Sequence, residues 1–460
     1  GAINGVSELH GRVSRHLFSS LFSRWSVPEI PIGYVTNGVH TPSWDSELAD
    51  RLWTTACGKD RWIGSMETLA QDIQKLPDNA FWQLRNDSRK IFVDYIRERL
   101  ERQQAVAQNV FDPNTLTLGF ARRFVPYKRP NLLLHDPQRL IRLLTNKDYP
   151  VQLVIAGKAP PADESGRALI RQWIEFIEQY DLCNHVIFLS DYDMLLSEHL
   201  VQGVDVWLNT PRRPWEACGT SGMKVLVNGG INLSELDGWW AEAYTPEVGW
   251  AIGDKQEHDD EAAWDAEEAE ALYRLLENDV VPEFYHRNTD GIPEKWVEKM
   301  RKSMGILTPK FSANRTVREY TEKYYLPAAT AYKNRAADNG AEGKNILHII
   351  NDLNCMWDKI KFGNMETLSF DKGYQFNIEV LLDEGKLENI VVEMYADGIN
   401  GSASERIKMD KVALSEDGKV YRYEAKVFTK RQANDYTVRI IPYYKSINVP
   451  LETSLIHWQR

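Results

Sequence analysis

Apolar runs alternate with helix-like segments through the middle of the chain, and this alternation limits the fold more than any other feature. The strand-like runs are 116–120, 151–155, 186–189, 204–208 and 249–252. The helix-like segments 129–144, 165–180 and 194–202 separate the first four of these runs. Such alternation predicts an α/β fold with a doubly wound parallel sheet, in which ligands bind beyond the carboxyl ends of the strands.

Positive charge follows these predicted strands. Arg122, Arg123, Lys128 and Arg129 come after the first run, and Lys158 follows the second. The chain as a whole carries a formal net charge of −11, which argues against broad binding to nucleic-acid backbones. Local cations on an acidic chain predict an anionic ligand, and the alternative is a set of solvated surface side chains.

A stretch rich in small residues, 215–224, follows the fourth run. A turn between a buried strand and a helix leaves backbone N–H groups free for an anion, and Thr220 and Ser221 add hydroxyl donors. Lys224 lies in the first turn of the expected helix, where its amine suits a charge contact or a Schiff base with an aldehyde cofactor. The alternative is a glycine-rich surface turn with a solvated lysine.

The remaining segments predict helices and then a β-rich tail. Helices are expected over 1–24, 60–107 and 255–300, and in a last helix that Ser312 caps and that runs to about residue 334. Alternation in 375–380, 390–395, 420–425 and 436–441 predicts an antiparallel β-sandwich. The expected domains are a helical lead-in 1–110, a Rossmann-like lobe 111–335 and the sandwich 344–460, with 335–343 as a linker.

Four cysteines are scattered along the chain without a CxxC pair: Cys57, Cys183, Cys218 and Cys355. This spacing favours a reducing, cytoplasmic environment and predicts no metal site. No apolar run approaches the roughly 20 residues of a membrane span, so neither a membrane nor a nucleic acid is expected as a partner.

Residues 216–224, followed by Asn228-Gly229 and Leu236-Asp237-Gly238, closely resemble the cofactor segment of glycogen and maltodextrin phosphorylases. The resemblance implies that Lys224 holds pyridoxal 5′-phosphate as a Schiff base. It also implies that Thr220 and Ser221 bind the phosphate of this cofactor.

Other segments carry the same resemblance. The segment 123–129 is similar to the family's phosphate segment, which implies that Arg123 and Lys128 grip the substrate phosphate. Tyr192 falls where the family keeps a tyrosine near the cofactor. The positions that resemble the family's contacts to the glucosyl unit are Asn37 in a Thr-Asn-Gly turn, Glu216, Cys218 and Gly219. Cys218 stands where serine is usual.

The resemblance covers residues 1 to about 335 and does not extend to the tail. It implies a divergent, bacterial-type α-glucan phosphorylase, a glycosyltransferase that transfers a glucosyl unit from glycogen or maltodextrin to inorganic phosphate and releases glucose 1-phosphate. The family combines two lobes of the GT-B type. The chain is therefore expected to be the carboxyl-terminal portion of a longer enzyme, inactive alone, whose partner is the missing amino-terminal lobe.

Two other functions remain open from the residues. A nucleotide-sugar glucosyltransferase, such as a glycogen or starch synthase, shares the paired-lobe fold but carries no Schiff-base lysine. A non-catalytic glucan-binding module is the other alternative, because the tail offers aromatic residues that serve either as sugar platforms or as sandwich core. These aromatic residues are Trp357, Tyr374, Tyr395, Tyr421 and Tyr443.

Overall fold

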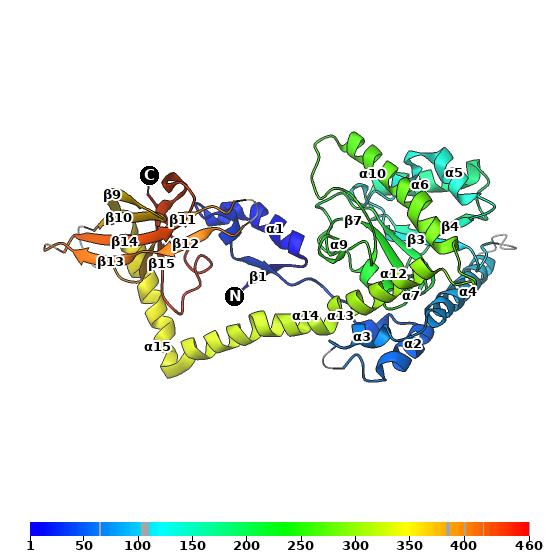
Figure 1. Cartoon of the computed structure of the whole chain (residues 1–460), viewed down its shortest axis with the longest axis horizontal. Helices are drawn as coiled ribbons and strands as arrows, with labels where there is room; N and C mark the ends of the chain where they lie inside the picture. The colour runs from blue at the N-terminus through cyan, green and yellow to red at the C-terminus, as the bar shows by residue number, and fades with distance from the viewer. Residues whose placement is uncertain (64–65, 103–109, 383–386, 400–401, 417, 460) are drawn as a thin grey trace. The chain divides into compact units, whose positions relative to one another are not determined.

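The computed structural model (Figure 1) describes residues 1–63, 66–102, 110–382, 387–399, 402–416 and 418–459. The chain forms two compact units. The larger unit consists of Asn4–Val13 and Gly33–Thr321, and the smaller unit consists of Gly1–Ile3, Ser14–Ile32 and Glu322–Arg460. The smaller unit thus includes an early segment of the chain, whereas the predicted domains follow the chain in order. The three-domain division stays a prediction.

A six-stranded sheet of strand order β5-β4-β3-β6-β7-β8 forms the centre of the larger unit. Its strands are β3 (Leu116–Arg123), β4 (Val151–Lys158), β5 (Val186–Leu189), β6 (Val206–Asn209), β7 (Ile231–Glu235) and β8 (Gly249–Ile252). Every neighbouring pair is parallel. This order is that of a doubly wound Rossmann-type sheet, so the predicted α/β class is confirmed.

Alternate side chains of each strand enter different cores. Leu153 and Ile155 of β4 pack with the helices α5 (Pro137–Leu144), α6 (Glu164–Gln179) and α10 (Glu261–Leu275). Val154 and Ala156 pack on the other face with α4 (Asp78–Arg102) and α7 (Met194–Gly203). A strand covered on both faces is favoured by apolar residues on both of its sides, which explains the mostly apolar runs in the sequence.

Strand β7 is absent from the sequence-based prediction. The sequence indicates a helix over 224–230, but the observed helix is shorter. Helix α8 (Ser221–Leu226) ends before the turn at Gly229, and β7 begins at Ile231. The strand alternates apolar and polar residues although it is fully buried. Two of its polar side chains are hydrogen-bonded inside the fold, since Asn232 donates to the carbonyl of Gly222 at 3.0 Å and Ser234 accepts from Asn209 at 2.9 Å. A polar buried strand carries no apolar run that a sequence pattern can detect.

Other helices differ from the predicted ranges. The predicted helix at 129–144 begins only at Pro137, because Asp136 caps α5 by accepting the N–H of Arg139. Two short 3-10 helices, Pro126–Lys128 and Leu132–His135, precede it. The predicted helix at 60–107 is resolved into α3 (Leu69–Ile73) and α4, while residues 64–65 and 103–107 lie outside the described residues.

The remaining helices and strands of the first 320 residues are short. They are β1 (Ile3–Gly5), α1 (Glu8–Leu17), β2 (Ile32–Tyr34), α2 (Glu47–Cys57), α9 (Trp240–Ala243), α11 (Val281–Tyr285), α12 (Glu294–Lys302), α13 (Thr308–Lys310) and α14 (Ala313–Tyr320). Single π-helical turns occupy Leu276–Val280 and Ser303–Leu307. The predicted cap of α14 is confirmed, because Ser312 accepts the N–H of Arg315.

A buried ionic cluster anchors the sheet to α4. Asp205, which precedes β6, accepts hydrogen bonds from Arg89 at 2.7 Å and Arg85 at 3.3 Å, and also from the backbone N–H of Thr117 at 2.9 Å. Both guanidinium groups and the carboxylate are fully buried. Arg85 further donates to four backbone carbonyl groups, among them that of Asn228. The cluster therefore ties α4 to the centre of the sheet.

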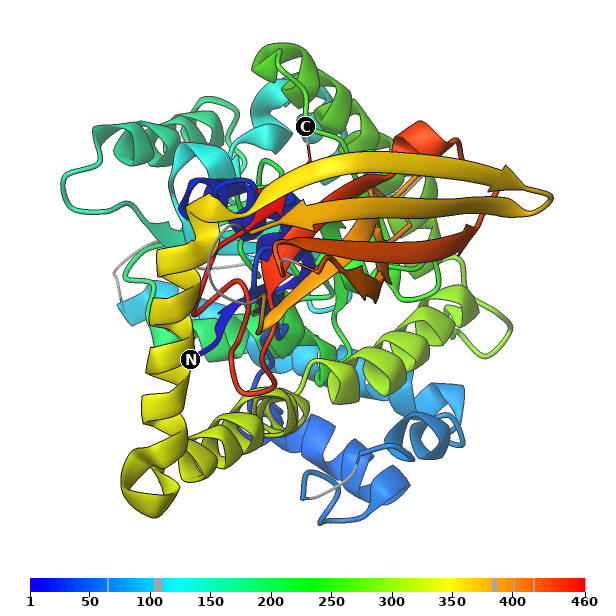
Figure 2. The same ribbon diagram turned by 90° about the vertical axis from the view of Figure 1, so that its left-hand side faces the viewer.

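The smaller unit contains two four-stranded antiparallel sheets, of order β13-β14-β10-β9 and β12-β11-β15-β16 (Figure 2). The strands are β9 (Lys361–Phe370), β10 (Gly373–Leu381), β11 (Ile390–Ala396), β12 (Glu405–Lys408), β13 (Asp410–Leu414), β14 (Val420–Phe428), β15 (Thr437–Pro442) and β16 (His457–Trp458). Alternate residues of both sheets share one core, for example Phe376 with Val438. The predicted antiparallel strands are confirmed, and four further strands join them.

A buried arginine holds residues 14–32 in the smaller unit. The Arg439 guanidinium is fully buried and donates to Glu29 at 2.5 and 2.6 Å and to Glu393 at 2.7 Å. The ring of Tyr395 lies 4.3 Å from this guanidinium and that of Trp458 lies 5.1 Å from it. The paired charges and the rings compensate for the desolvation of the arginine.

The prediction of a linker at 335–343 is wrong in part. Helix α15 (Leu326–Met356), which follows a π-helical turn at Thr321–Tyr325, continues through it and is interrupted only at Ala337–Gly340. Three of these residues adopt positive φ angles, namely Asp338, Asn339 and Gly340. Helical structure therefore extends to residue 356, twelve residues past the predicted domain boundary at 344. Among the described residues, no helix combines the length and apolarity that crossing a membrane requires.

Candidate functional site

The strand order reverses between β3 and β6, because the chain moves from β3 to β4 on one side and later returns to β6 on the other. A crevice at the carboxyl ends of such a strand pair is where ligands bind in doubly wound sheets. The segment after β3 leads into the 3-10 helix Pro126–Lys128, and the segment after β6 leads through 210–220 into α8. These two segments carry most of the candidate residues.

A cluster of buried charges forms between these segments. Glu216 accepts hydrogen bonds from Arg122 at 2.8 Å and from the amine of Lys128 at 2.6 Å. All three side chains are buried. Burial favours the neutral form of Glu216, but the two cations outweigh it and hold the pKa of this carboxyl below its usual value. Burial and the charge of Arg122 lower the pKa of Lys128 to about 8, against the attraction of Glu216.

The cluster carries more positive than negative charge. Two buried cations, Arg122 and Lys128, pair with the carboxylate of Glu216, and the charge of the exposed Arg123 contributes to the lowered pKa of Lys128. One buried nitrogen of Arg122, Nη1, has no hydrogen-bond partner among the described residues. An excess of cations and an unsatisfied buried donor are the features expected of an anion site.

Arg129 plays a different role from its neighbours. Its guanidinium pairs with Glu268 and, at 3.0 Å, with Asp265, and it donates to the carbonyl groups of Thr210 at 3.0 Å and Pro211 at 2.9 Å. It is thus fully engaged inside the fold. The expectation of a ligand-facing cation is wrong for this residue.

The turn at 237–239 fixes the backbone of the 216–219 loop. Asp237 accepts the N–H of Glu216 at 2.9 Å, and the N–H of Trp239 bonds to the carbonyl of Cys218 at 2.9 Å. Gly238 has a φ of +49°, and a Cβ atom there would lie 2.3 Å from the carbonyl oxygen of Cys218. Burial raises the pKa of Asp237 to about 7, although two N–H groups favour its ionised form. Close packing therefore positions the loop.

Three of the predicted sugar-binding residues lie together. Burial raises the pKa of the Cys218 thiol to about 12, and a backbone hydrogen bond with Asn37 partly offsets this effect. The Cys218 thiol is therefore neutral at physiological pH. In this form it can pack against its neighbours or donate a weak hydrogen bond, but it cannot act as a nucleophile. Gly219, the next residue, has a φ of +87°, and a Cβ atom there would lie 3.4 Å from the side chain of Glu216.

Lys224 lies in α8 with its amine 3.6 Å from the ring centroid of Trp44. Burial lowers the pKa of this amine below its ordinary value. Its amine forms no hydrogen bond or ion pair with any residue that the structure describes. A half-buried amine without a carboxylate partner is more easily deprotonated, and the neutral amine is the form that reacts with an aldehyde.

The remaining predicted cofactor residues surround α8. Thr220 directly precedes the helix, and Ser221 accepts the indole N–H of Trp207 at 3.3 Å. Tyr192 bonds to Ser197 at 3.2 Å and packs against the apolar cluster that contains Trp207. No recorded contact joins Tyr192 to Lys224, so its role as a cofactor contact stays a prediction.

Sequence reasoning named no role for two residues at this site, Asp237 and Trp44. It named Arg122 among the cations, but Arg122 and Arg123 are consecutive in β3 and point to opposite sides, so the pattern alone does not say which of them faces the crevice. The contacts of Asp237 to Glu216 and of Trp44 to Lys224 join residues that are not neighbours in the sequence, so no local pattern reveals them.

Comparison with known proteins places the chain in a family. Residues 1–253, more than half of the chain, match the model of carbohydrate phosphorylases. The chain belongs to the carbohydrate phosphorylase family. Residues 357–460 match the glycogen phosphorylase C-terminal domain. The expectation that the resemblance ends near residue 335 is therefore wrong, because the tail belongs to a recognised domain of the same proteins.

Several curated relatives share the sequence. Glycogen phosphorylase of Mycobacterium tuberculosis is 41% identical in an alignment of 374 positions that covers 79% of this chain and 43% of the relative. Glycogen phosphorylase of Aquifex aeolicus is 40% identical in an alignment of 334 positions that covers 70% of this chain and 47% of the relative. Maltodextrin phosphorylase of Thermococcus litoralis is 32% identical in an alignment of 477 positions that covers 99% of this chain and 56% of the relative.

The chain spans about half the length of the curated relatives that it matches. The two matched family models cover residues 1–253 and 357–460. These matches do not confirm the prediction that the chain is the carboxyl-terminal portion of a longer enzyme.

Proposed function

We propose that this chain contributes the cofactor and phosphate side of an α-glucan phosphorylase. Glycogen or maltodextrin and inorganic phosphate would be its substrates, and glucose 1-phosphate its product. The observation that carries the proposal is the combination, in a phosphorylase-family chain, of a surplus of cations around Glu216 with an unpaired, half-buried amine at Lys224. The larger unit would form one lobe of a GT-B type enzyme, with an amino-terminal lobe as its partner.

The residues present fit pyridoxal 5′-phosphate. Lys224 would hold the aldehyde, because its amine is half-buried and its pKa is lowered. Thr220 and Ser221 would contact the cofactor phosphate at the start of α8, and Tyr192 would lie beside it. When bound, the cofactor supplies a phosphate group next to the substrate phosphate. Two neighbouring phosphates repel each other, which accounts for the surplus of cations nearby.

The chain's own side chains would divide the remaining work. Arg123 and Lys128 would hold the substrate phosphate, and the unsatisfied Nη1 of Arg122 provides a further donor. Glu216, pinned by Asp237 and by two cations, would accept a sugar hydroxyl in a fixed position. The further sugar contacts would come from Asn37, Cys218 and Gly219.

The two alternatives lose support. Family membership argues against a nucleotide-sugar synthase. For a glucan-binding tail, the aromatic residues must be exposed, but Trp357 and Tyr421 are buried in the sandwich core, and Tyr395 is buried against Arg439 and Trp458. Tyr443 is 61% exposed, but a single exposed ring does not make a sugar-binding platform.

The four cysteines are free, which supports the proposed cytoplasmic location.

A reductive labelling experiment tests the proposal. The purified chain is incubated with pyridoxal phosphate, reduced with borohydride, digested and analysed by mass spectrometry. We expect one pyridoxyl adduct, on Lys224, while the exposed Lys147 serves as an internal control and stays unmodified. Release of glucose 1-phosphate from maltodextrin by the natural protein that contains this chain is the second readout. Labelling spread over surface lysines, or no adduct at all, would contradict the proposal.

The lowered pKa of Lys128 predicts a pH dependence of phosphate binding. Below pH 8 its amine is a cation that attracts phosphate, and above pH 8 it becomes neutral, so affinity should fall. One pH unit above the pKa, about a tenth of the amines remain charged, which corresponds to up to about a tenfold loss. Calorimetric titration with inorganic phosphate at pH 7 and pH 9 measures the loss.

Lys128→Arg is the matched control, because arginine stays charged over this range. The ionisation of phosphate itself is common to both proteins and cancels in the ratio of their affinities. We expect the wild-type protein to lose about tenfold more affinity than Lys128→Arg between the two pH values. A ratio that stays constant with pH would show that Lys128 does not contact the phosphate.

A further inference from the structure

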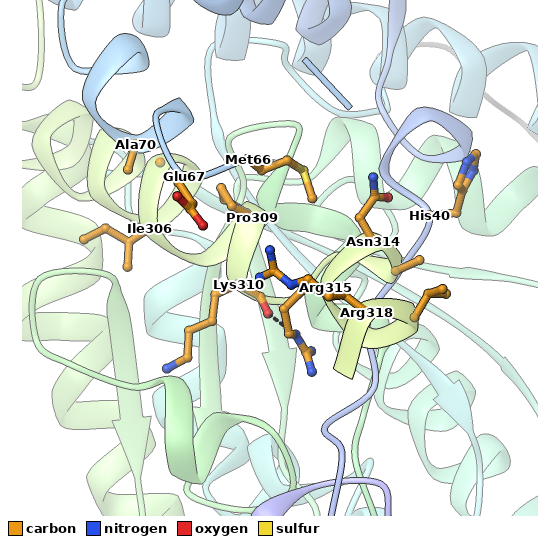
Figure 3. A pocket seen from close by; sticks show the side chains of 13 residues that line it. His40, Met66, Glu67, Ala70, Ile306, Pro309, Lys310, Asn314, Arg315 and Arg318 are labelled. Carbon is orange, nitrogen blue, oxygen red and sulfur yellow. Dashed lines mark hydrogen bonds between the residues drawn. The ribbon is translucent and has the colours of Figure 1, made fainter. Parts of the chain in front are cut away.

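A cavity of about 840 Å³ lies in the larger unit, lined by residues of α3, α13 and α14 (Figure 3). Ligand pockets commonly measure roughly 300–1,000 Å³. Its apolar lining includes Met66, Ile306, Pro309 and Val317. Ile306 is 43% exposed and Val317 is 61% exposed, so this lining has no cover among the described residues. The lining residues include none of the residues assigned to the cofactor or phosphate.

Cations dominate the polar part of the lining. Lys310, Arg315 and Arg318 come from neighbouring turns of α13 and α14, and Glu67 is the carboxylate that lines the pocket with them (Figure 3). Arg315 is already engaged by the carbonyl of Lys310 at 2.8 Å and by the carboxylate of Glu319 at 3.3 Å, and the amine of Lys310 donates to the carbonyl of Glu242 at 3.4 Å. The side chain of Arg318 is exposed and forms no hydrogen bond or ion pair with a described residue. An apolar wall with this available cation is complementary to an organic anion that has an apolar body.

The pocket connects directly to the 36–40 segment. The backbone of Val39 exchanges hydrogen bonds with Phe311 at 3.0 Å and Ala313 at 2.7 Å, at the start of α14. Arg315, which lines the pocket, donates to the carbonyl of Asn37 at 3.1 Å. A Cβ atom on Gly38 would lie 2.2 Å from the carbonyl oxygen of Ser312, so the two segments are in close backbone contact.

The other side of the same segment faces the proposed sugar site. Val39 of this segment belongs to the same buried cluster as Cys218 and Phe311, and Thr36 donates to Glu242 at 2.8 Å. The segment 36–40 thus lies between the pocket and Cys218. Any ligand that moves Arg315 or the start of α14 also acts on the backbone beside Cys218.

We propose that this pocket binds an effector, a small organic anion with an apolar body, and that its occupancy alters the neighbouring Cys218 site through the 36–40 segment. The binding step stands independently of the proposed function. The regulatory effect rests on the proposed function, because the coupling can regulate sugar binding only if the Cys218 site binds sugar.

Fluorescence titration with anilinonaphthalene sulfonate, an aromatic sulfonate, tests the binding step. Arg318→Glu should weaken binding at least about tenfold by reversing a charge at the pocket, and Ile306→Trp should weaken it similarly by filling the cavity. Arg142→Glu, an exposed arginine on α5, is the matched control and should leave the affinity unchanged. Equal affinities in all four proteins, or an equal loss in the control, would overturn the proposal.

Hydrogen–deuterium exchange of the backbone amides in 36–40 and 216–219 tests the coupling without relying on activity. A saturating amount of the same probe should change the exchange rates of these amides at least about fivefold in the wild-type protein and leave them unchanged in Arg318→Glu. The backbone amides of α5 are the internal control. Unchanged exchange rates in both segments would refute the coupling. Absence of a pyridoxyl adduct on Lys224 would refute the proposed function alone, because neither of these readouts involves Lys224.

Discussion

Replacement of Lys224 by arginine is expected to abolish incorporation of pyridoxal phosphate. In the wild-type protein the amine of Lys224 lies 3.6 Å from the ring centroid of Trp44. An arginine keeps a positive charge over this ring, but its guanidinium remains protonated and does not react with an aldehyde. In the natural protein that contains this chain, phosphorolysis should fall by at least ~10³-fold, the scale on which loss of one charge-stabilising group acts. Absorbance, adduct mass and glucose 1-phosphate release measure these effects.

The fold should tolerate this change. A cation–π contact contributes about 0.5–2 kcal/mol, and Lys224→Arg retains it, so the thermal midpoint should stay close to that of the wild type. Lys224→Ala is the second variant, which loses both the amine and the ring contact. Cofactor bound at full stoichiometry by Lys224→Arg, or undiminished phosphorolysis, would show that another residue holds the cofactor.

The strands of the sheet were largely predictable from the sequence, for a physical reason. Strands buried on both faces need continuous apolar runs, and the runs 186–189 and 249–252 coincide with β5 and β8 residue for residue. Strand β7 escaped prediction because its polar side chains are buried in hydrogen bonds, such as that between Asn209 and Ser234 at 2.9 Å. Burial that depends on hydrogen bonding leaves no apolar signature.

The sequence identified the segments that form the candidate site, but it did not identify which of their residues contact one another. The segments 122–129 and 215–224 were found from their charges and small residues, and the sheet brings them together. The pairing of Arg122 with Glu216 joins residues 94 positions apart, so no local pattern reveals it. The same holds for Arg439 and Glu29, 410 positions apart, which place residues 14–32 with the β-sandwich rather than with the neighbouring helices.

Replacement of Asp205 by alanine is expected to cause the largest loss of stability. Asp205 is fully buried and accepts hydrogen bonds from Arg85, Arg89 and the N–H of Thr117. Its removal leaves two buried guanidinium groups without a counter-charge, and breaking a buried ion pair in this way costs about 3–5 kcal/mol. Denaturant titration of the larger unit should therefore show a clearly lower free energy of unfolding.

Two further variants separate charge from hydrogen bonding in this cluster. Asp205→Asn keeps an acceptor but removes the negative charge, so its loss should lie below that of Asp205→Ala. Asp259→Ala, at an exposed position, should change the free energy of unfolding by no more than about 0.5 kcal/mol. A loss below about 1 kcal/mol for Asp205→Ala would show that the guanidinium groups find other partners. The loss should also loosen the sheet beside the site, because the carboxylate that is removed accepts the N–H of Thr117 in β3, while the backbone hydrogen bonds of residue 205 to Thr117 and Ile231 remain.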